Sequence, residues 1–187
     1  MLSNIGNKIK SRKSPNDKIY TPKQVALTMI EMCNIQPNEK VLDPSKGEGV
    51  FYDNLPDYCI KSYCEIDDNI DFFDCDERFD LIIGNPPYSL WTRWVDHTMK
   101  LTDKFCYIFG FLNLSDIRIK YILDNGYGVA KMHLFKVDWW FGNSFVVLFE
   151  KNTPSILTVH PTRVLCDVCN GRCKQGRNGN LPNECTA

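Results

Sequence analysis

The stretch "DLIIGNPPYS", residues 80–89, joins an apolar run to a stiff loop. Residues 81–83 are typical of the end of a buried strand. The run stops at Gly84, and two successive prolines then remove two backbone donors and fix two φ angles. Asn85 and Tyr88 are thereby presented at the carboxyl end of a strand, where open α/β sheets place their ligands. Taken alone, the proline pair also fits an ordinary strand-terminating turn, so the rest of the chain must decide.

Strand and helix patterns alternate on both sides of this stretch. Short apolar runs typical of strands occupy residues 40–43, 60–67, 78–84 and 104–112. Helical patterns occupy residues 21–33, 50–55, 89–102 and 114–126. Two further strand patterns, at residues 128–141 and 144–151, are separated only by "GN" and predict a hairpin. Together they predict an α/β fold with a doubly wound, mainly parallel sheet and a C-terminal antiparallel hairpin.

The composition is that of an ordinary globular domain. Of the 187 residues, 43% are hydrophobic and 24% are charged, which excludes a disordered chain. No apolar run approaches the roughly 18 residues that a bilayer requires, and the N-terminus lacks the apolar stretch of a signal peptide. We therefore expect no membrane partner and a cytoplasmic location, in the host cell if the source is viral. The nine cysteines are then expected to be mostly reduced.

Charge is distributed unevenly along the chain. Residues 1–23 carry six Lys and Arg against one acid, and residues 151–187 carry five against two. The segment between them is strongly acidic, which the overall net charge of -1 conceals. Basic ends suit a polyanionic partner such as nucleic acid, although basic tails are also common solubilising features.

The glycine-rich stretch "VLDPSKGEG", residues 41–49, follows the first strand pattern. Asp43 ends the strand, and Gly47 and Gly49 allow the backbone to approach a ligand closely. A carboxylate at this point suits an ammonium or sulfonium group better than a phosphate. About 20 residues later Glu65 ends the second strand, where an acid takes ribose hydroxyls in nucleoside-binding sheets. An ordinary βα turn and a solvated surface glutamate are the structural alternatives.

Five segments in order resemble the motif series of a known family. They are "YTP" (20–22), "VLDPSKGEG" (41–49), "CEID" (64–67), "DFF" (71–73) and "NPPY" (85–88). The series is similar to that of the S-adenosylmethionine-dependent N6-adenine DNA methyltransferases, over roughly residues 18–150. The resemblance implies a seven-stranded class I methyltransferase-like, Rossmann-like sheet, S-adenosylmethionine as cofactor and DNA as partner. It divides the chain into a basic N-terminal arm (1–17), a catalytic domain (18–152) and a Cys-rich basic tail (153–187).

The resemblance also implies cofactor-binding residues. The methionine carboxylate would be bordered by Tyr20, Thr21 and Pro22. Asp43 would bind the cofactor's amino group, directly or through water, with Gly47 and Gly49 making room for it. Glu65 would hold the ribose hydroxyls.

The same resemblance implies that the "DFF" segment binds the adenine of the cofactor. Asp71 would bind the adenine amino group, and Phe72 would contact the ring through its backbone or side chain. Asp74 is a nearby competitor for the role of Asp71.

The resemblance implies that the loop 85–88 is catalytic. The side-chain oxygen of Asn85 and the carbonyl oxygen of Pro86 would each accept one N–H of the target adenine amino group. This frees the nitrogen lone pair to attack the sulfonium methyl group, and Pro86 and Pro87 keep both acceptors rigid. Tyr88 would stack on a base extruded from the double helix.

The resemblance leaves the acceptor open. Similar loops serve enzymes that methylate amino groups in RNA or the glutamine amide of release factors, and a catalytically idle binding subunit is a further alternative. The "YTP" segment and the tyrosine after the prolines favour adenine in DNA. Because the segments between motifs are short, either target recognition comes from the termini and from a partner subunit or a second copy of the chain, or the DNA sequence that is read is short and loose.

The C-terminal tail holds a cluster of four cysteines. Cys166, Cys169, Cys173 and Cys185 have the spacing C-x2-C-x3-C-x11-C and are candidate zinc ligands. Three basic residues in the same segment, Arg172, Lys174 and Arg177, are candidates to face phosphates. A flexible terminal segment without metal is the competing interpretation.

Overall fold

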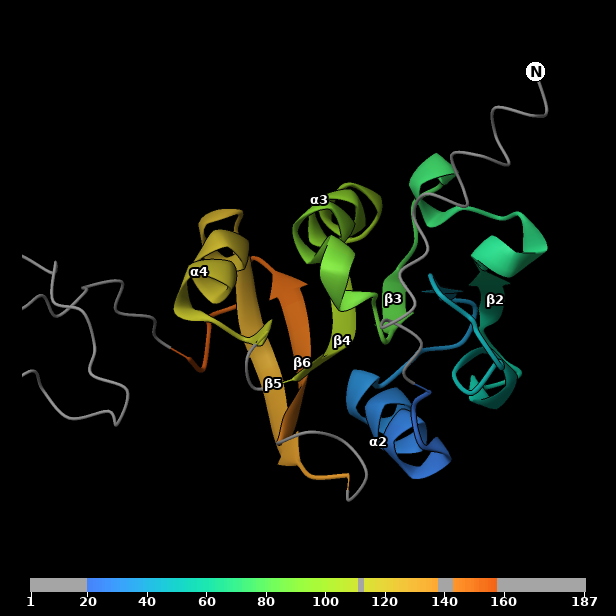
Figure 1. Ribbon diagram of the computed structural model, residues 1–187, viewed down its shortest axis with the longest axis horizontal. Helices are drawn as coiled ribbons and strands as arrows, with labels where there is room; N and C mark the ends of the chain where they lie inside the picture. Colours follow the sequence, from blue (N-terminus) through green and yellow to red (C-terminus); the bar gives the residue numbers. More distant parts are fainter. Residues whose placement is uncertain (1–19, 111–112, 138–142, 158–187) are drawn as a thin grey trace, which may run out of the picture.

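A six-stranded sheet with helices on both faces forms the body of the computed structural model, which describes residues 20–110, 113–137 and 143–157 (Figure 1). The strand order is β2-β1-β3-β4-β6-β5. The strands are β1 (Lys40–Asp43), β2 (Ile60–Tyr63), β3 (Leu81–Gly84), β4 (Lys104–Gly110), β5 (Tyr127–Phe135) and β6 (Ser144–Lys151). The first four are parallel to one another, whereas β6 runs antiparallel to both β4 and β5.

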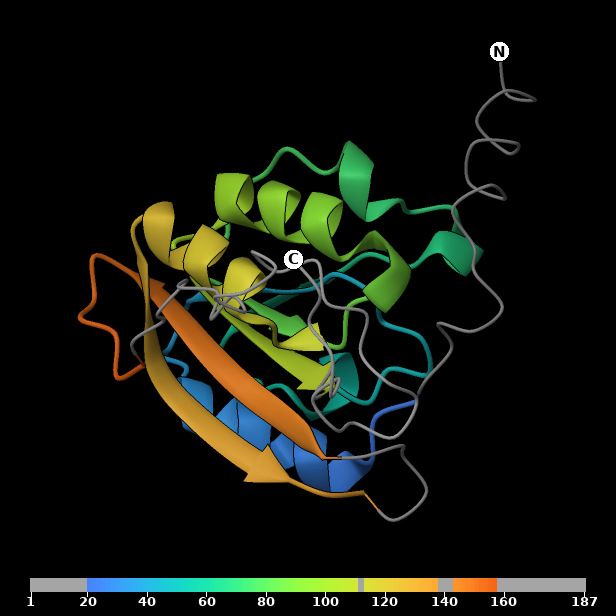
Figure 2. The same cartoon turned by 60° about the vertical axis from the view of Figure 1, so that its left-hand side comes forward.

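Three α-helices of the described part of the chain cover the sheet. Helix α2 (Lys23–Cys33) lies on one face, and α3 (Trp91–Leu101) and α4 (Asp116–Asp124) lie on the other, as the turned view shows most clearly (Figure 2). Helix α4 begins where Ser115 accepts a hydrogen bond from the Arg118 N–H, and α2 ends at Asn34 in the left-handed conformation. Among the described residues, no helix is long and apolar enough to cross a membrane.

Two apolar clusters hold these layers together, one on each face of the sheet. The face under α3 and α4 is aromatic, with the ring of Phe105 stacked on that of Phe149 at 4.9 Å between centroids. The face under α2 is aliphatic and includes Met29 and Ile83. Because the central strands are buried on both sides, they appear in the sequence as continuous apolar runs rather than alternating ones.

The structure corrects three details of the expected fold. The helix expected over residues 50–55 is a single 3-10 turn, η1 (Tyr52–Asn54), since Pro56 leaves too few residues for an α-helix. Strand β2 stops at Tyr63, and residues beyond Glu65 form the turn η2 (Ile66–Asp68). The prediction of a two-residue hairpin turn is also wrong, because Phe135 pairs with Ser144 and residues 136–143 connect the strands.

The described residues form six strands, whereas the resemblance implied seven. The chain between β2 and β3 makes the turns η2 and η3 (Phe72–Asp74) and then runs unpaired through the exposed charged residues 76–78. Such residues are unsuited to a further buried strand, so β2 remains at the edge of the sheet.

Candidate functional site

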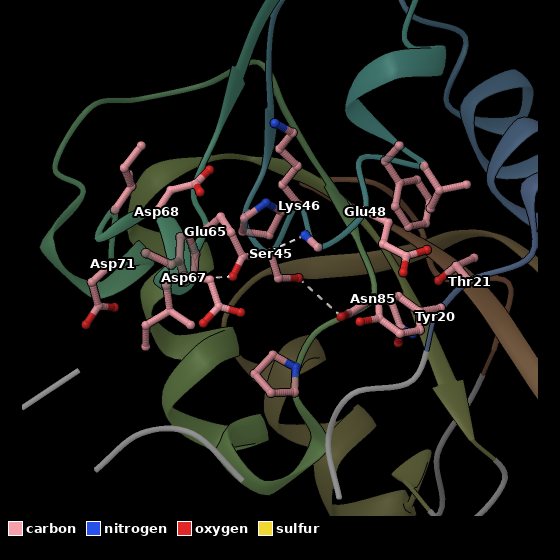
Figure 3. Close-up of a pocket in the computed structure, with 18 of the residues that line it drawn as sticks. Tyr20, Thr21, Ser45, Lys46, Glu48, Glu65, Asp67, Asp68, Asp71 and Asn85 are labelled. Carbon is pink, nitrogen blue, oxygen red and sulfur yellow. Dashed lines mark hydrogen bonds between the residues drawn. The ribbon is translucent and has the colours of Figure 1, made fainter. Parts of the chain in front are cut away.

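A pocket of about 700 Å³ opens where β1, β2 and β3 end, which is the size of a small-molecule site (Figure 3). Its walls come from four segments far apart in the sequence, at residues 20–21, 44–54, 65–73 and 85–90, together with Trp94 of α3. The pocket therefore lies at the carboxyl edge of the sheet, where ligands were expected.

Two glycines shape the loop after β1. Gly47 and Gly49 both have left-handed backbones, with φ of 53° and 85°. Gly47 lines the pocket, whereas a Cβ atom on Gly49 would lie 2.6 Å from the Asp53 carboxylate. The loop therefore needs glycine at position 47 for its left-handed backbone at the pocket. It needs glycine at position 49 for its left-handed backbone and also because a side chain would not fit against Asp53.

Glu65 ties the first two loops together. One oxygen of its carboxylate accepts a hydrogen bond from the Gly47 N–H at 2.7 Å, and the other accepts from the Asp67 N–H at 3.0 Å. Glu65 also lines the pocket, and each of its oxygens has a second lone pair available. It can therefore receive ligand hydroxyls without giving up its structural bonds.

Asp43 lies beneath the pocket rather than in its wall. Its side chain is 0% exposed, and burial raises its pKa to about 7. Its Oδ1 accepts a hydrogen bond from the Ser45 N–H at 3.2 Å, whereas Oδ2 has no hydrogen-bond partner among the described residues. A buried acceptor in this condition calls for a donor from water or a ligand.

The "DFF" segment forms the opposite wall. Asp71 is buried and accepts a hydrogen bond from the Phe73 N–H at 2.9 Å, which begins the turn η3. The ring centroids of Phe72 and Trp94 lie 4.5 Å apart, so this side of the pocket is both acidic and aromatic. Asp74 is exposed and does not line the pocket, which places Asp71 and not its competitor at the site.

The loop after β3 supplies the floor nearest to β1. Asn85 and Pro87 line the pocket, whereas Pro86 is buried and Tyr88 begins the turn η4 (Tyr88–Leu90), and neither of these two residues lines it. The Asn85 carbonyl oxygen accepts a hydrogen bond from the Ser45 hydroxyl at 3.2 Å. The loops after β1 and β3 are thus joined directly.

The N-terminal "YTP" segment is divided between two cavities. Tyr20 and Thr21 lie beside Glu48 and Asn85 on one side of the pocket (Figure 3). Pro22 instead precedes α2 and lines a second cavity, of about 720 Å³, between α2 and β5.

Acidic side chains dominate the pocket. Its lining includes Glu48, Asp53, Glu65, Asp67, Asp68 and Asp71. Among the described residues that line it, Lys46 is the only basic one, and its ammonium group lies 4.1 Å from the centroid of the Tyr63 ring. Such a wall favours a cationic ligand over an anionic one.

Most of the lining residues were not singled out by the sequence analysis, and Ser45 and Trp94 are two of them. Ser45 lies inside the glycine-rich stretch, where only the glycines and the acid attracted attention, and Trp94 sits on α3 among residues that fit an ordinary amphipathic helix. The four tail cysteines lie outside the described residues, and within those residues no group of His, Cys, Asp and Glu is arranged to hold a metal ion.

Comparison with known proteins identifies similar chains. No model of a known protein family matches. The type II methyltransferase M.HincII of Haemophilus influenzae is 33% identical over 94 residues, which cover 43% of this chain and 19% of that protein. The match therefore spans about a fifth of the length of this curated relative.

Solved structures resemble the fold more completely. A methyltransferase from Pyrococcus furiosus superposes with a TM-score of 0.57 at 14% identity, over 81% of this chain and 96% of that one. The 23S rRNA methyltransferase ErmE superposes with a TM-score of 0.56 at 13% identity, over 75% of this chain and 72% of that one. These likenesses confirm the class I methyltransferase-like fold predicted from the sequence.

Proposed function

We propose that the chain is an S-adenosylmethionine-dependent methyltransferase that modifies the exocyclic amino group of adenine in DNA. The observation that carries this proposal is the junction of an acidic pocket with the Asn85 loop at one edge of a class I methyltransferase-like sheet. The partial identity to a type II methyltransferase supports DNA as the substrate.

The residues of the pocket fit the cofactor. S-adenosylmethionine supplies an electrophilic methyl group on a positively charged sulfur, and the six lining carboxylates suit that charge. Glu65 is held where it can accept from ribose hydroxyls, and Asp71 with Phe72 forms the wall that we assign to the adenine ring. The buried Oδ2 atom of Asp43 is available to a donor, which we assign to the cofactor's ammonium group or to an intervening water.

Asn85 and the proline pair hold the acceptor nitrogen in this proposal. The lone pair of an adenine amino nitrogen is delocalised into the ring, so the nitrogen is a weak nucleophile. Acceptance of its two N–H bonds by the Asn85 side chain and the Pro86 carbonyl favours tetrahedral geometry and localises the lone pair. The stiffness of Pro86 and Pro87 keeps both acceptors in place before the base arrives. Tyr88, on the adjoining turn, is assigned to stacking on the extruded base.

We assign recognition of the target sequence to elements outside the pocket. The described segments between the site elements are short turns, such as η2, η3 and η4, with no separate module among them. We propose that the basic termini, a partner subunit or a second copy of the chain supplies it. Gel-shift titration with and without residues 1–17 tests the contribution of the N-terminal arm.

We also propose that Cys166, Cys169, Cys173 and Cys185 hold one zinc ion in the tail. Four thiols within one short basic segment motivate this assignment. Elemental analysis of protein purified without a metal-binding tag is expected to find about one zinc per chain. A zinc content near zero, with all four thiols freely titratable in the native protein, would remove the metal from the proposal.

The substrate is tested by following the methyl group. The protein is incubated with labelled cofactor and with DNA, RNA and a release-factor protein in parallel, and each product is digested to monomers. We expect the label in N6-methyladenine from DNA. Label in an RNA nucleoside would transfer the proposal to RNA, and label found only in protein would overturn the assignment to nucleic acid.

A further inference from the structure

Ser45 connects the cofactor side of the pocket to the acceptor loop. Its hydroxyl donates a hydrogen bond to the Asn85 carbonyl oxygen at 3.2 Å, across 40 positions of sequence (Figure 3). Both residues line the same pocket. The contact therefore joins two segments that contribute different halves of the site.

The peptide unit that Ser45 contacts carries a single hydrogen-bonding group. The Asn85 carbonyl belongs to the Asn85–Pro86 peptide, and the proline nitrogen carries no hydrogen. The carbonyl oxygen is thus the single hydrogen-bonding group of that peptide unit. The orientation of this unit sets the direction of the chain on either side of it, including the Asn85 side chain and the Pro86 carbonyl.

Ser45 is itself firmly placed. Its N–H donates to the buried Asp43 carboxylate at 3.2 Å, and the next N–H, of Lys46, donates to the Cys64 carbonyl at 3.0 Å. These bonds fix the start of the loop against the ends of β1 and β2. The Ser45 hydroxyl is consequently held in place by these two backbone hydrogen bonds.

The two loops also approach as closely as their backbones allow. A Cβ atom on Gly84, the residue before Asn85, would lie 3.2 Å from Pro44 Cδ and 3.4 Å from Asp43 Oδ1. The close approach brings the Ser45 hydroxyl within reach of the Asn85 carbonyl.

We infer that Ser45 is a positioning residue, which orients the Asn85–Pro86 peptide so that its acceptors face the target amino group. The inference rests on the proposed function in assigning those acceptors to the amino nitrogen. It adds that the loop in contact with the cofactor also sets the geometry of the acceptor site.

Three substitutions separate the hydroxyl from the volume of the side chain. Ser45→Ala removes the donor, Ser45→Cys keeps the size but has only a weak donor, and Ser45→Thr keeps the hydroxyl. Thr28→Ala is the matched control, because it deletes a hydroxyl-to-carbonyl hydrogen bond of 3.0 Å on α2, outside the pocket.

Hydrogen exchange of the free protein is the first measurement, because it needs neither cofactor nor substrate. The amides of residues 88–90 report on the loop, since the two prolines have none. We expect Ser45→Ala and Ser45→Cys to exchange about 3- to 10-fold faster at these amides, the range for one lost hydrogen bond. Ser45→Thr and Thr28→Ala are expected to exchange at the wild-type rate. Unchanged exchange in Ser45→Ala would overturn the inference.

Kinetics and binding supply the second measurement. Ser45→Ala is expected to lower kcat about 10-fold while the Kd of S-adenosylhomocysteine stays within about twofold, and Ser45→Thr is expected to restore kcat. Weaker binding with unchanged kcat would make Ser45 a cofactor ligand and overturn the positioning role. Absence of methyl transfer in the wild type would refute the proposed function, whereas the exchange result would still decide whether Ser45 holds the loop.

Discussion

The two halves of the sheet are built by different means. Strands β1, β2 and β3 have four residues each, whereas β4, β5 and β6 have seven, nine and eight. The strand-connecting loops that line the pocket all follow the three short strands. The long strands instead carry the stacked rings of the aromatic core.

The loops that follow the short strands are held by individual side-chain hydrogen bonds to the backbone. Side chains of Asp43, Ser45, Glu65 and Asp71 each bond to a backbone group in a loop at the pocket. In the long half the backbone ladders and apolar contacts fix the strands, and side-chain bonds such as that of the Tyr127 hydroxyl to the Thr102 carbonyl oxygen add to them. A substitution should therefore harm stability in one half and function in the other, and the following predictions test that division from the largest effect to the smallest.

Phe105→Ala in the long half should cost the most stability. The ring is fully buried and packs on Phe149 at 4.9 Å and on Tyr127 at 5.5 Å. We expect a loss of about 3–5 kcal/mol in the free energy of unfolding, measured with urea. Tyr58→Ala, at a largely exposed ring, should cost about 1 kcal/mol or less. Equal losses at the two positions would contradict the assignment of the core.

Asp43→Asn should change how stability depends on pH. The unfolded Asp43 carboxyl ionises near pH 4, but burial raises the folded pKa to about 7. The contribution of the Asp43 carboxyl to stability is therefore fully present at low pH. It falls by about 1.4 kcal/mol per pH unit between the unfolded and the folded pKa, up to about 4 kcal/mol in total.

The measurement for Asp43 is the free energy of unfolding of wild type and variant from pH 4 to pH 8. The difference between the two should move in favour of Asp43→Asn as the pH rises. Asp76→Asn, at an exposed acid in the same half, provides the control. Parallel curves for wild type and Asp43→Asn would show that Asp43 is not buried as described.

Asn85→Ala should reduce activity while leaving the fold intact. Loss of one preorganised acceptor costs about 100-fold or more in rate. Transfer of label to adenine-containing DNA is the assay, with cofactor Kd and unfolding measured in parallel and expected near wild type. Asn125→Ala, which removes an exposed side-chain bond to the Tyr121 carbonyl, should retain full activity. Wild-type turnover in Asn85→Ala would remove Asn85 from the mechanism.

Glu65→Gln should produce the smallest of these effects. A glutamine amide can accept from only one of the two N–H groups that Glu65 now serves, so the loop after β1 loosens at the ribose position. We expect the Kd of S-adenosylhomocysteine to rise about 10-fold, by calorimetry. Glu77→Gln, which disrupts an exposed pair with Lys40, should leave the Kd unchanged.

The elements predicted from the sequence are those fixed by local pattern. The buried runs of β3 and β4 and the amphipathic α3 follow from periodicity, and the wall residues Glu65 and Asp71 follow from their motif positions. The hairpin connection was misjudged because the aromatic residues 139–141 extend the apolar pattern beyond Phe135, where the described pairing stops.

Other features depend on contacts between distant segments. Asp43 and Pro86 are buried and do not line the pocket, and the chain segments at the ends of β1 and β3 approach each other closely there. The bond from Ser45 to Asn85 spans 40 positions and leaves no local pattern. Such geometry cannot be inferred from spacing along one chain.

The placement of Lys46 has a kinetic consequence. Its ammonium group lies against the rings of Tyr63 and Tyr52, and among the described residues of the lining it is the one basic side chain, against six carboxylates. In the proposed reaction the methyl donor arrives with a charged sulfur and the product leaves with a neutral one. In that reaction the excess of carboxylates would favour capture of the charged donor at low ionic strength and would attract the product, with its neutral sulfur, less strongly than the donor.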